Sequence, residues 1–175
     1  GRPGVAKIIG QAKKRLDRLE QERQRLEVLR TYEHRYEDAY PMICGIDEVG
    51  RGPLAGPVCA AAVILPRDCE ILYINDSKKL SEARRELLYD EIMEKAVAVG
   101  LGFASPEKID EVNILQATYI AMRQAIAELA VAPDLLLNDA VTIPEVSVKQ
   151  VPIIKGDAKS ISIAAASIVA KVTRD

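Results

Sequence analysis

Four acidic residues follow apolar stretches that have the length and composition of buried strands. These residues are Asp47, Glu48, Asp139 and Asp157. A charge at the edge of a buried strand needs compensation, and carboxylate oxygens are ligands that Mg²⁺ prefers. Two such ions about 4 Å apart activate a water and stabilise the leaving oxygen of a phosphodiester. Each acid alone is more typical of a cap or a surface position. Together they indicate a divalent-metal site at the strand ends.

A glycine-rich segment, residues 50–56, joins the first two expected strands. It lacks a Gly-Lys-Ser/Thr ending and precedes a strand, which excludes a P-loop and a dinucleotide-binding fingerprint. Gly50 and Gly52 flank Arg51 and allow the backbone to approach a ligand closely. A tight hairpin would use the same glycines.

A second polar segment, residues 76–81, precedes an expected helix that Ser81 caps. Ser77, Lys78 and Lys79 offer a hydroxyl and two ammonium groups near the helix N-terminus, which suits a phosphate clamp. A solvated helix cap is the plainer interpretation of the same residues.

The scaffold is predicted from hydrophobic periodicity. Strands are expected at 42–47, 57–65, 70–74, 96–104, 134–139 and 148–154, and helices after Ser81, from Pro106, at 114–130 and at 161–172. The order β-β-β-α-β-α-β-β-α predicts an α/β domain in which an antiparallel start is followed by crossover connections. In the helix after Ser81, the expected inner face holds Leu87, Leu88, Ile92 and Met93.

The N-terminal segment, residues 5–38, predicts one long amphipathic helix, with apolar residues mostly three, four or seven apart. The stripe fades at Arg23 and Arg30, which argues against a sustained coiled coil and leaves a short helical partner open. We expect this helix to pack on the main domain or to project from it. Tyr32, Tyr36 and Tyr40 repeat every four residues, and docking on the domain is favoured over base stacking. The chain then divides into a helical extension, 1–40, and a domain, 41–175.

Composition limits the classes of protein that fit. The 175 residues are 49% apolar and 29% charged, as in a single globular domain, and the net charge of −2 requires that a nucleic acid be met by local patches and metal ions. No apolar run is long enough for a membrane span, so no membrane role is expected. Cys44, Cys59 and Cys69 form no CxxC pair, which disfavours disulfides and zinc and favours the cytoplasm.

Residues 45–58, Gly-Ile-Asp-Glu-Val-Gly-Arg-Gly-Pro-Leu-Ala-Gly-Pro-Val, resemble the signature of ribonuclease HII, the type 2 ribonuclease H. Segments 76–81, 109–118, 155–157 and 164–175 are similar to this family as well. The resemblance implies an RNase H-like mixed five-stranded sheet flanked by helices and a four-carboxylate site for Mg²⁺ or Mn²⁺, expected to hold two ions. It also implies hydrolysis of the RNA strand of RNA–DNA hybrids, including cleavage 5′ of a ribonucleotide embedded in duplex DNA.

The resemblance assigns roles residue by residue. Asp47, Glu48, Asp139 and Asp157 would hold the metal, with Asp47 bridging the two ions, and the stretch 50–52 would sense the ribose 2′-hydroxyl. The expected substrate-binding residues are Gly50, Arg51, Gly52, Ser77, Lys78, Lys79, Lys155 and Lys171. A monomer is expected.

Two other functions fit parts of the sequence, and the chain differs from the family pattern at its C-terminal end. The sister ribonuclease HIII carries a β-containing N-terminal domain, whereas residues 1–38 indicate helix only. A helical interaction module with a silent nuclease domain is the non-enzyme alternative, which retention of all four acids disfavours. The family continues past Asp175 into further helices and a junction tyrosine, so a C-terminally truncated, slowly cleaving member is expected. Its last helix, from Ile161, would then leave part of its apolar face uncovered.

Overall fold

The computed structural model describes residues 1–50 and 56–175, and the expectations for Arg51 and Gly52 lie outside them. The strands are β1 (Ile43–Val49), β2 (Val58–Ile64), β3 (Ala98–Ala104), β4 (Leu135–Asp139) and β5 (Lys149–Ile153). The helices are α1 (Arg2–Leu29), α2 (Thr31–Tyr36), α3 (Glu82–Lys95), α4 (Pro106–Val112), α5 (Ile114–Ala127) and α6 (Ile161–Arg174), with 3₁₀ turns η1 (Ser77–Lys79) and η2 (Gly156–Ala158).

The strands form one mixed sheet in the order β3-β2-β1-β4-β5. β1, β2 and β3 pair antiparallel, whereas β4 pairs parallel with β1 and β5 pairs parallel with β4. This confirms the antiparallel start followed by crossovers. Five of the six expected strands are confirmed, with ends that differ by at most two residues.

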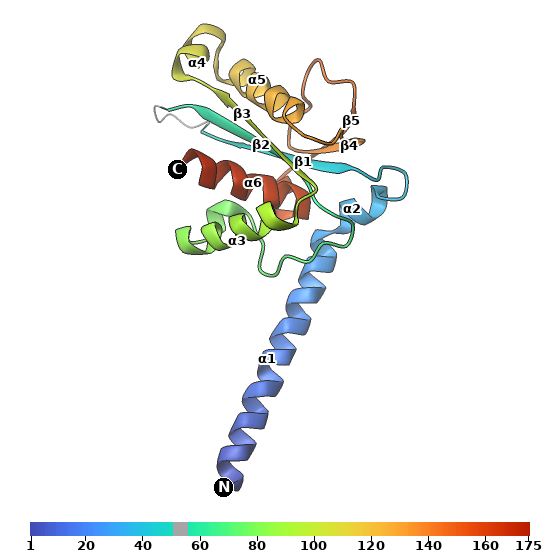
Figure 1. The fold of residues 1–175 in the computed structure, drawn as a ribbon, viewed down its shortest axis with the longest axis vertical. Helices are drawn as coiled ribbons and strands as arrows, with labels where there is room; N and C mark the ends of the chain where they lie inside the picture. The colour runs from blue at the N-terminus through green and yellow to red at the C-terminus, as the bar shows by residue number, and fades with distance from the viewer. Residues whose placement is uncertain (51–55) are drawn as a thin grey trace.

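Helices cover both faces of the sheet (Figure 1), with α3 and α6 on one side and α4 and α5 on the other. Every residue of β2 is buried, because alternate side chains enter the two helical layers. Ser81 caps α3 as predicted, since its side chain accepts a hydrogen bond from the Arg84 amide. Leu88 and Ile92 are buried in α3, but Leu87 and Met93 are exposed, so the expected inner face was too wide.

The strand expected at 70–74 is wrong, because these residues form an irregular turn. Ile71 and Ile74 are fully buried beneath the sheet as isolated apolar anchors. They fill the core beside residues of α3 and α6 and do not pair with an edge strand of the sheet.

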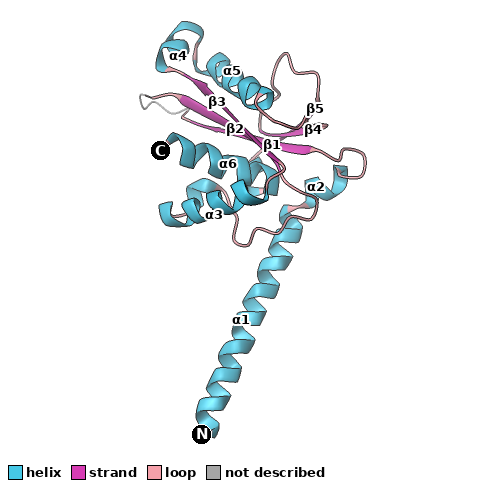
Figure 2. Cartoon of the chain, viewed as in Figure 1, coloured by secondary structure: helices cyan, strands magenta, loops and turns pink. Residues whose placement is uncertain are grey.

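The long N-terminal helix is confirmed as α1, but it ends at Leu29 and not near residue 38, because a second helix, α2, begins at Thr31 (Figure 2). Arg30 lies between them with φ −94° and ψ 8°, and its guanidinium donates to the Cys69 carbonyl and pairs with Glu27 at 2.9 Å. These contacts fix the turn, since the sequence alone offers no helix breaker there.

The N-terminal helix projects from the domain, and the structure buries only its last turns. Val5, Ile8, Ile9 and Leu16 of the predicted stripe are exposed, whereas Leu26 and Leu29 are buried. The expected docking of the tyrosines is confirmed. Tyr32, Tyr36 and Tyr40 pack against a cluster formed by Ile43, Leu135, Leu137, Ile153 and Ile163.

Helix α6 packs directly on β1, where Gly45 lies so close that an added Cβ would be 2.1 Å from the Ser162 carbonyl carbon. Ile161, Ala165, Ile168 and Val169 are buried, which contradicts the expectation of an uncovered apolar face. The sheet and α3 cover that face. Among the described residues, no helix is both long and apolar enough to cross a membrane.

Candidate active site

Three aspartates from separate elements converge at one edge of the sheet. Asp47 lies on β1, Asp139 ends β4, and Asp157 lies in η2. Ile46 pairs with Asn138 in the parallel ladder, so the next residues along the two strands are Asp47 and Asp139. One carboxylate oxygen from each of the three aspartates lies within 4.8 Å of the others. The sequence-predicted grouping of these three acids is therefore present in the structure.

The three aspartates line a pocket with several other predicted site residues. Its lining also includes Glu48, Val49, Ser77, Lys78, Ser167 and Lys171. Glu48 reaches the pocket without belonging to the three-aspartate group, and its amide donates to Asp47 Oδ1 at 2.8 Å. Lys79 and Lys155 are exposed and do not line this pocket. The structure thus brings Ser77, Lys78 and Lys171 to the acids and leaves the other two lysines outside.

The electrostatics of the group are those of crowded, buried carboxylates. Burial raises the pKa of Asp47 well above its ordinary value, and the charges of Glu48 and Asp139 raise it further. Burial also raises the pKa of Asp157 to about 6, with Asp139 and Asp76 adding to the effect and Lys78 opposing it. Such a group needs positive charge to be stable in its ionised form.

Asp76 and Ser167 contribute to the site, although the sequence analysis did not select them. The Asp76 side chain hydrogen-bonds to Asp157 and caps η1 by accepting from the Lys78 amide at 3.0 Å. The Ser167 hydroxyl lies 2.7 Å from that of Ser77. An acid two residues before a pair of lysines, in the segment Asp76-Ser77-Lys78-Lys79, was a usable signal for Asp76. No local pattern marks Ser167, whose place depends on how α6 packs.

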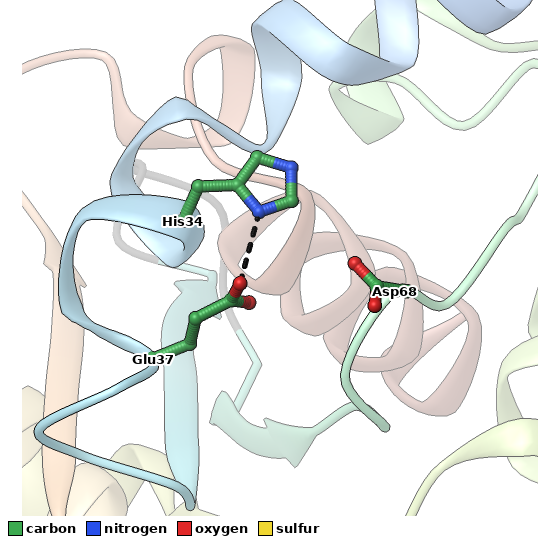
Figure 3. Close-up of side chains that lie close together, drawn as sticks. All are labelled: His34, Glu37 and Asp68. Carbon is green, nitrogen blue, oxygen red and sulfur yellow. Dashed lines mark hydrogen bonds and ion pairs between the residues drawn. The ribbon is translucent and has the colours of Figure 1, made fainter.

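A second cluster of possible metal ligands lies away from the three aspartates (Figure 3). His34 and Glu37 come from the α2 region, Asp68 from the loop after β2, and His34 Nδ1 is 3.2 Å from Glu37. The Arg67 guanidinium is 3.2 Å from Glu37. The Arg67 charge and the hydrogen bond between His34 and Glu37, which is the chief cause of the raised pKa of His34, account for this cluster without a metal ion.

The three-aspartate group fits a divalent cation. Its donors are all carboxylate oxygens, as Mg²⁺ and Mn²⁺ require, and a cation would offset the mutual repulsion that raises the pKa of Asp47. A mixed sheet covered by helices, with carboxylates gathered at the ends of its central strands, defines the RNase H-like class of metal-dependent nucleases.

Comparison with family models narrows this class. Residues 44–175 match the model of ribonuclease HII, and residues 1–37 match that of the ribonuclease HII N-terminal domain. The chain belongs to the ribonuclease HII family and is an endoribonuclease. Both matches are to ribonuclease HII, which disfavours the ribonuclease HIII alternative.

Individual relatives agree with this assignment. The ribonuclease HII of Lachnoclostridium phytofermentans is 70% identical over 174 residues, which are 99% of this chain and 68% of that protein. The ribonuclease HII of Bacillus cytotoxicus is 54% identical over 175 residues, 99% of this chain and 67% of that protein. The crystal structure of ribonuclease H2 from Pyrococcus horikoshii has a TM-score of 0.65 at 27% identity, covering 76% of this chain and 72% of the other.

Proposed function

We propose that the chain hydrolyses the RNA strand of RNA–DNA hybrids and cuts on the 5′ side of ribonucleotides embedded in duplex DNA. The products would carry a 3′-hydroxyl and a 5′-phosphate. The convergence of Asp47, Asp139 and Asp157 within 4.8 Å carries the proposal, because it forms an oxygen-donor site beside two lysines suited to phosphates.

The proposed metal ligands are Asp47, Glu48, Asp139 and Asp157, which would hold two Mg²⁺ or Mn²⁺ ions. Bound ions supply an activated water and stabilise charge on the leaving oxygen. The protein holds the carboxylates in place, since Asp139 also accepts a hydrogen bond from the Gly156 amide at 2.9 Å. Asp76 lies beside Asp157, where its charge and its side-chain hydrogen bond help to raise the pKa of Asp157.

Substrate contacts fall into an inner and an outer set. Lys78 and Lys171 line the acid pocket and are proposed to contact the phosphates beside the cleaved bond, with Ser77 at the same wall. Lys79 and Lys155 are exposed and would meet phosphates further away.

The proposed sensor of the 2′-hydroxyl is the backbone of Gly50, Arg51 and Gly52. Gly50 supports this role because its φ of +101° suits glycine. A Cβ at Gly50 would lie 2.6 Å from the Pro57 carbonyl oxygen. The missing side chain at Gly50 therefore lets the backbone of the proposed sensor pack against Pro57 and Arg174.

The division of the chain, its oligomeric state and its location are proposed as well. We propose a helical segment, 1–40, that serves the domain 41–175, a monomeric state, and a cytoplasmic location that suits three free cysteines. Light scattering, which measures the mass of the particle in solution, tests the monomeric state.

The decisive experiment is cleavage of duplex DNA that contains one ribonucleotide, with all-DNA duplex as the control. The proposal expects Mg²⁺- or Mn²⁺-dependent cutting 5′ of the ribonucleotide. Absence of both cutting and metal binding would favour the helical interaction module instead.

A further inference from the structure

A buried carboxylate joins the N-terminal segment to the domain. Glu33 of α2 is only 9% exposed, yet it lies among the first residues of α6, which is 127 residues later in the chain. Its Oε2 accepts a hydrogen bond of 2.6 Å from the Ser160 hydroxyl and one of 3.1 Å from the Ser162 amide. Glu33 therefore holds the start of α6 from outside the domain.

The direction of these hydrogen bonds is determined by the helix cap. Ser160 is the N-cap of α6, and its hydroxyl oxygen accepts from the Ile163 amide at 3.2 Å. The hydroxyl proton is then free to point to Glu33. Glu33 and Ser160 together satisfy two of the first amides of α6, and a carboxylate at this end of a helix also interacts favourably with the helix dipole.

The segment that Glu33 holds carries Asp157. Asp157 lies three residues before Ser160, in the turn between β5 and α6. The Gly156 amide binds Asp139 at one end of this turn, and Glu33 binds Ser160 and Ser162 at the other. Within the turn, the Ser160 amide donates to the Gly156 carbonyl at 2.8 Å, so the two anchors are linked through the backbone.

Packing of α2 reinforces the same contact. Tyr32 and Tyr36 flank Glu33 on α2 and contact the cluster that includes Ile153 of β5 and Ile163 of α6. These two residues lie on either side of Asp157 in the chain. The N-terminal segment therefore packs on a cluster to which residues before and after the Asp157 turn both belong.

We propose that Glu33 is a positioning residue for the metal site, through which the N-terminal segment holds the Asp157 turn in its binding geometry. The proposal rests on the proposed role of Asp157 as a metal ligand. It gives the N-terminal segment a task within the nuclease reaction that needs no contact between that segment and substrate.

The test compares Glu33→Ala with Met122→Ala, a matched control. Met122 is fully buried in α5 on the opposite face of the sheet, so its truncation lowers stability without touching the α6 N-terminus. We expect Glu33→Ala to raise the Kd for Mn²⁺ and to lower kcat on a single-ribonucleotide duplex, each by at least about tenfold, as loss of an outer-shell partner does. KM for the duplex should stay within about twofold, and Met122→Ala should keep the wild-type Kd.

Glu33→Gln provides the conservative variant, since its amide oxygen can accept both hydrogen bonds. We expect it to restore most of the Mn²⁺ affinity. If Glu33→Ala does not fold, Ser160→Ala removes the same hydrogen bond from the other side, and we expect at least about a threefold rise in the Kd for Mn²⁺. A wild-type Kd in the folded Glu33→Ala variant, or in Ser160→Ala, would overturn the proposal.

Hydrogen exchange separates this inference from the proposed function. In Glu33→Ala, the amides of residues 156–163 should exchange at least about tenfold faster than in Met122→Ala, whether or not metal is bound. Unchanged exchange there would overturn the positioning role. Failure of the unmodified chain to bind Mn²⁺ would instead overturn the proposed metal site. Hydrogen exchange would still show whether Glu33 holds residues 156–163 in place.

Discussion

The Gly156 amide donates a hydrogen bond of 2.9 Å to Oδ1 of Asp139, so one carboxylate both belongs to the three-aspartate group and holds the turn that carries Asp157. An added Cβ at Gly156 would be 2.5 Å from Ile163 Cδ1, so that side-chain tip would have to move, and it would be in ordinary contact, 3.5 Å, with the Asp139 Cα. Asp139 and Asp157 are therefore placed relative to each other by backbone contact as well as by the sheet.

Asp139→Asn separates the charge of this residue from its hydrogen bond. The amide oxygen can still accept from Gly156, so the fold should persist. We expect turnover to fall by at least about a thousandfold, or roughly 4 kcal/mol of transition-state stabilisation, because a metal ligand loses its charge. In EDTA the melting temperature should stay the same or rise, since repulsion of Asp47 is removed. Near wild-type cleavage at saturating Mg²⁺ would contradict the assignment.

The stability of the metal-free chain should depend on pH through the buried aspartates. The pKa of Asp157 is raised from 3.8 to about 6, and that of Asp47 is raised in the same direction. The folded state thus binds these protons more tightly than the unfolded state. The stabilisation of the folded state by the protonated aspartates is complete below pH about 4, and it is lost as the pH rises through about 6. Urea unfolding in EDTA should show a loss on the order of 1–3 kcal/mol between those pH values.

Two controls test the origin of that pH dependence. In a variant with both Asp47→Asn and Asp157→Asn, the loss should shrink, because neither side chain titrates. Saturating Mg²⁺ should reverse the trend in the unmodified chain, since the ion binds the deprotonated carboxylates. A pH profile that is unchanged in the double variant would place the titrating groups elsewhere.

Gly45→Ala should be strongly destabilising. The new Cβ would lie 2.1 Å from the Ser162 carbonyl carbon, so β1 and α6 must separate at the residues that Glu33 holds. We expect a loss of about 3 kcal/mol or more in thermal or urea unfolding, in the range of overpacked cores.

Gly10→Ala is the matched control for Gly45→Ala. Gly10 lies within α1, with no atom within 4 Å of an added Cβ. The substitution should stabilise the helix by about 0.5–1 kcal/mol. Equal changes in the free energy of unfolding for the two substitutions would show that close packing of β1 on α6 does not contribute to stability.

Lys78→Ala and Lys79→Ala should differ, although the lysines are adjacent. Both should weaken binding to every duplex and reduce the salt dependence by about one phosphate contact. Only Lys78 lines the acid pocket and lowers the pKa of Asp157. Lys78→Ala should therefore also move the acidic limb of the pH–rate profile to higher pH. Identical profiles for the two variants would contradict the inner and outer sets proposed for the lysines.

The periodicity of the sequence predicted most of the sheet, because strands buried on both faces produce continuous apolar runs such as 58–64. The prediction from periodicity failed at residues 70–74, where Ile71 and Ile74 are buried side chains of a turn. Whether apolar residues extend a sheet or fill a gap depends on free strand edges, which the local sequence does not contain.

The acids were predictable because each lies at the end of an apolar strand or shortly after it, and parallel pairing brings such strand ends together. The roles of Glu33 and Ser167 were not predictable from the sequence. Glu33 sits on a helix among other charged residues, and only the packing of α2 against α6 buries it. The contacts of Glu33 and Ser167 join residues 127 and 90 positions apart, and such contacts carry no signal in the spacing of either segment.

The length of α1 affects how the molecule moves in solution. Residues 2–21 of this helix contribute no buried side chain, and a helix of that length extends about 30 Å. The 19.2 kDa chain consequently has a larger hydrodynamic radius than a sphere of equal mass. A gel-filtration column calibrated with compact standards will overestimate its mass, so subunits should be counted by light scattering or sedimentation equilibrium, which do not depend on shape.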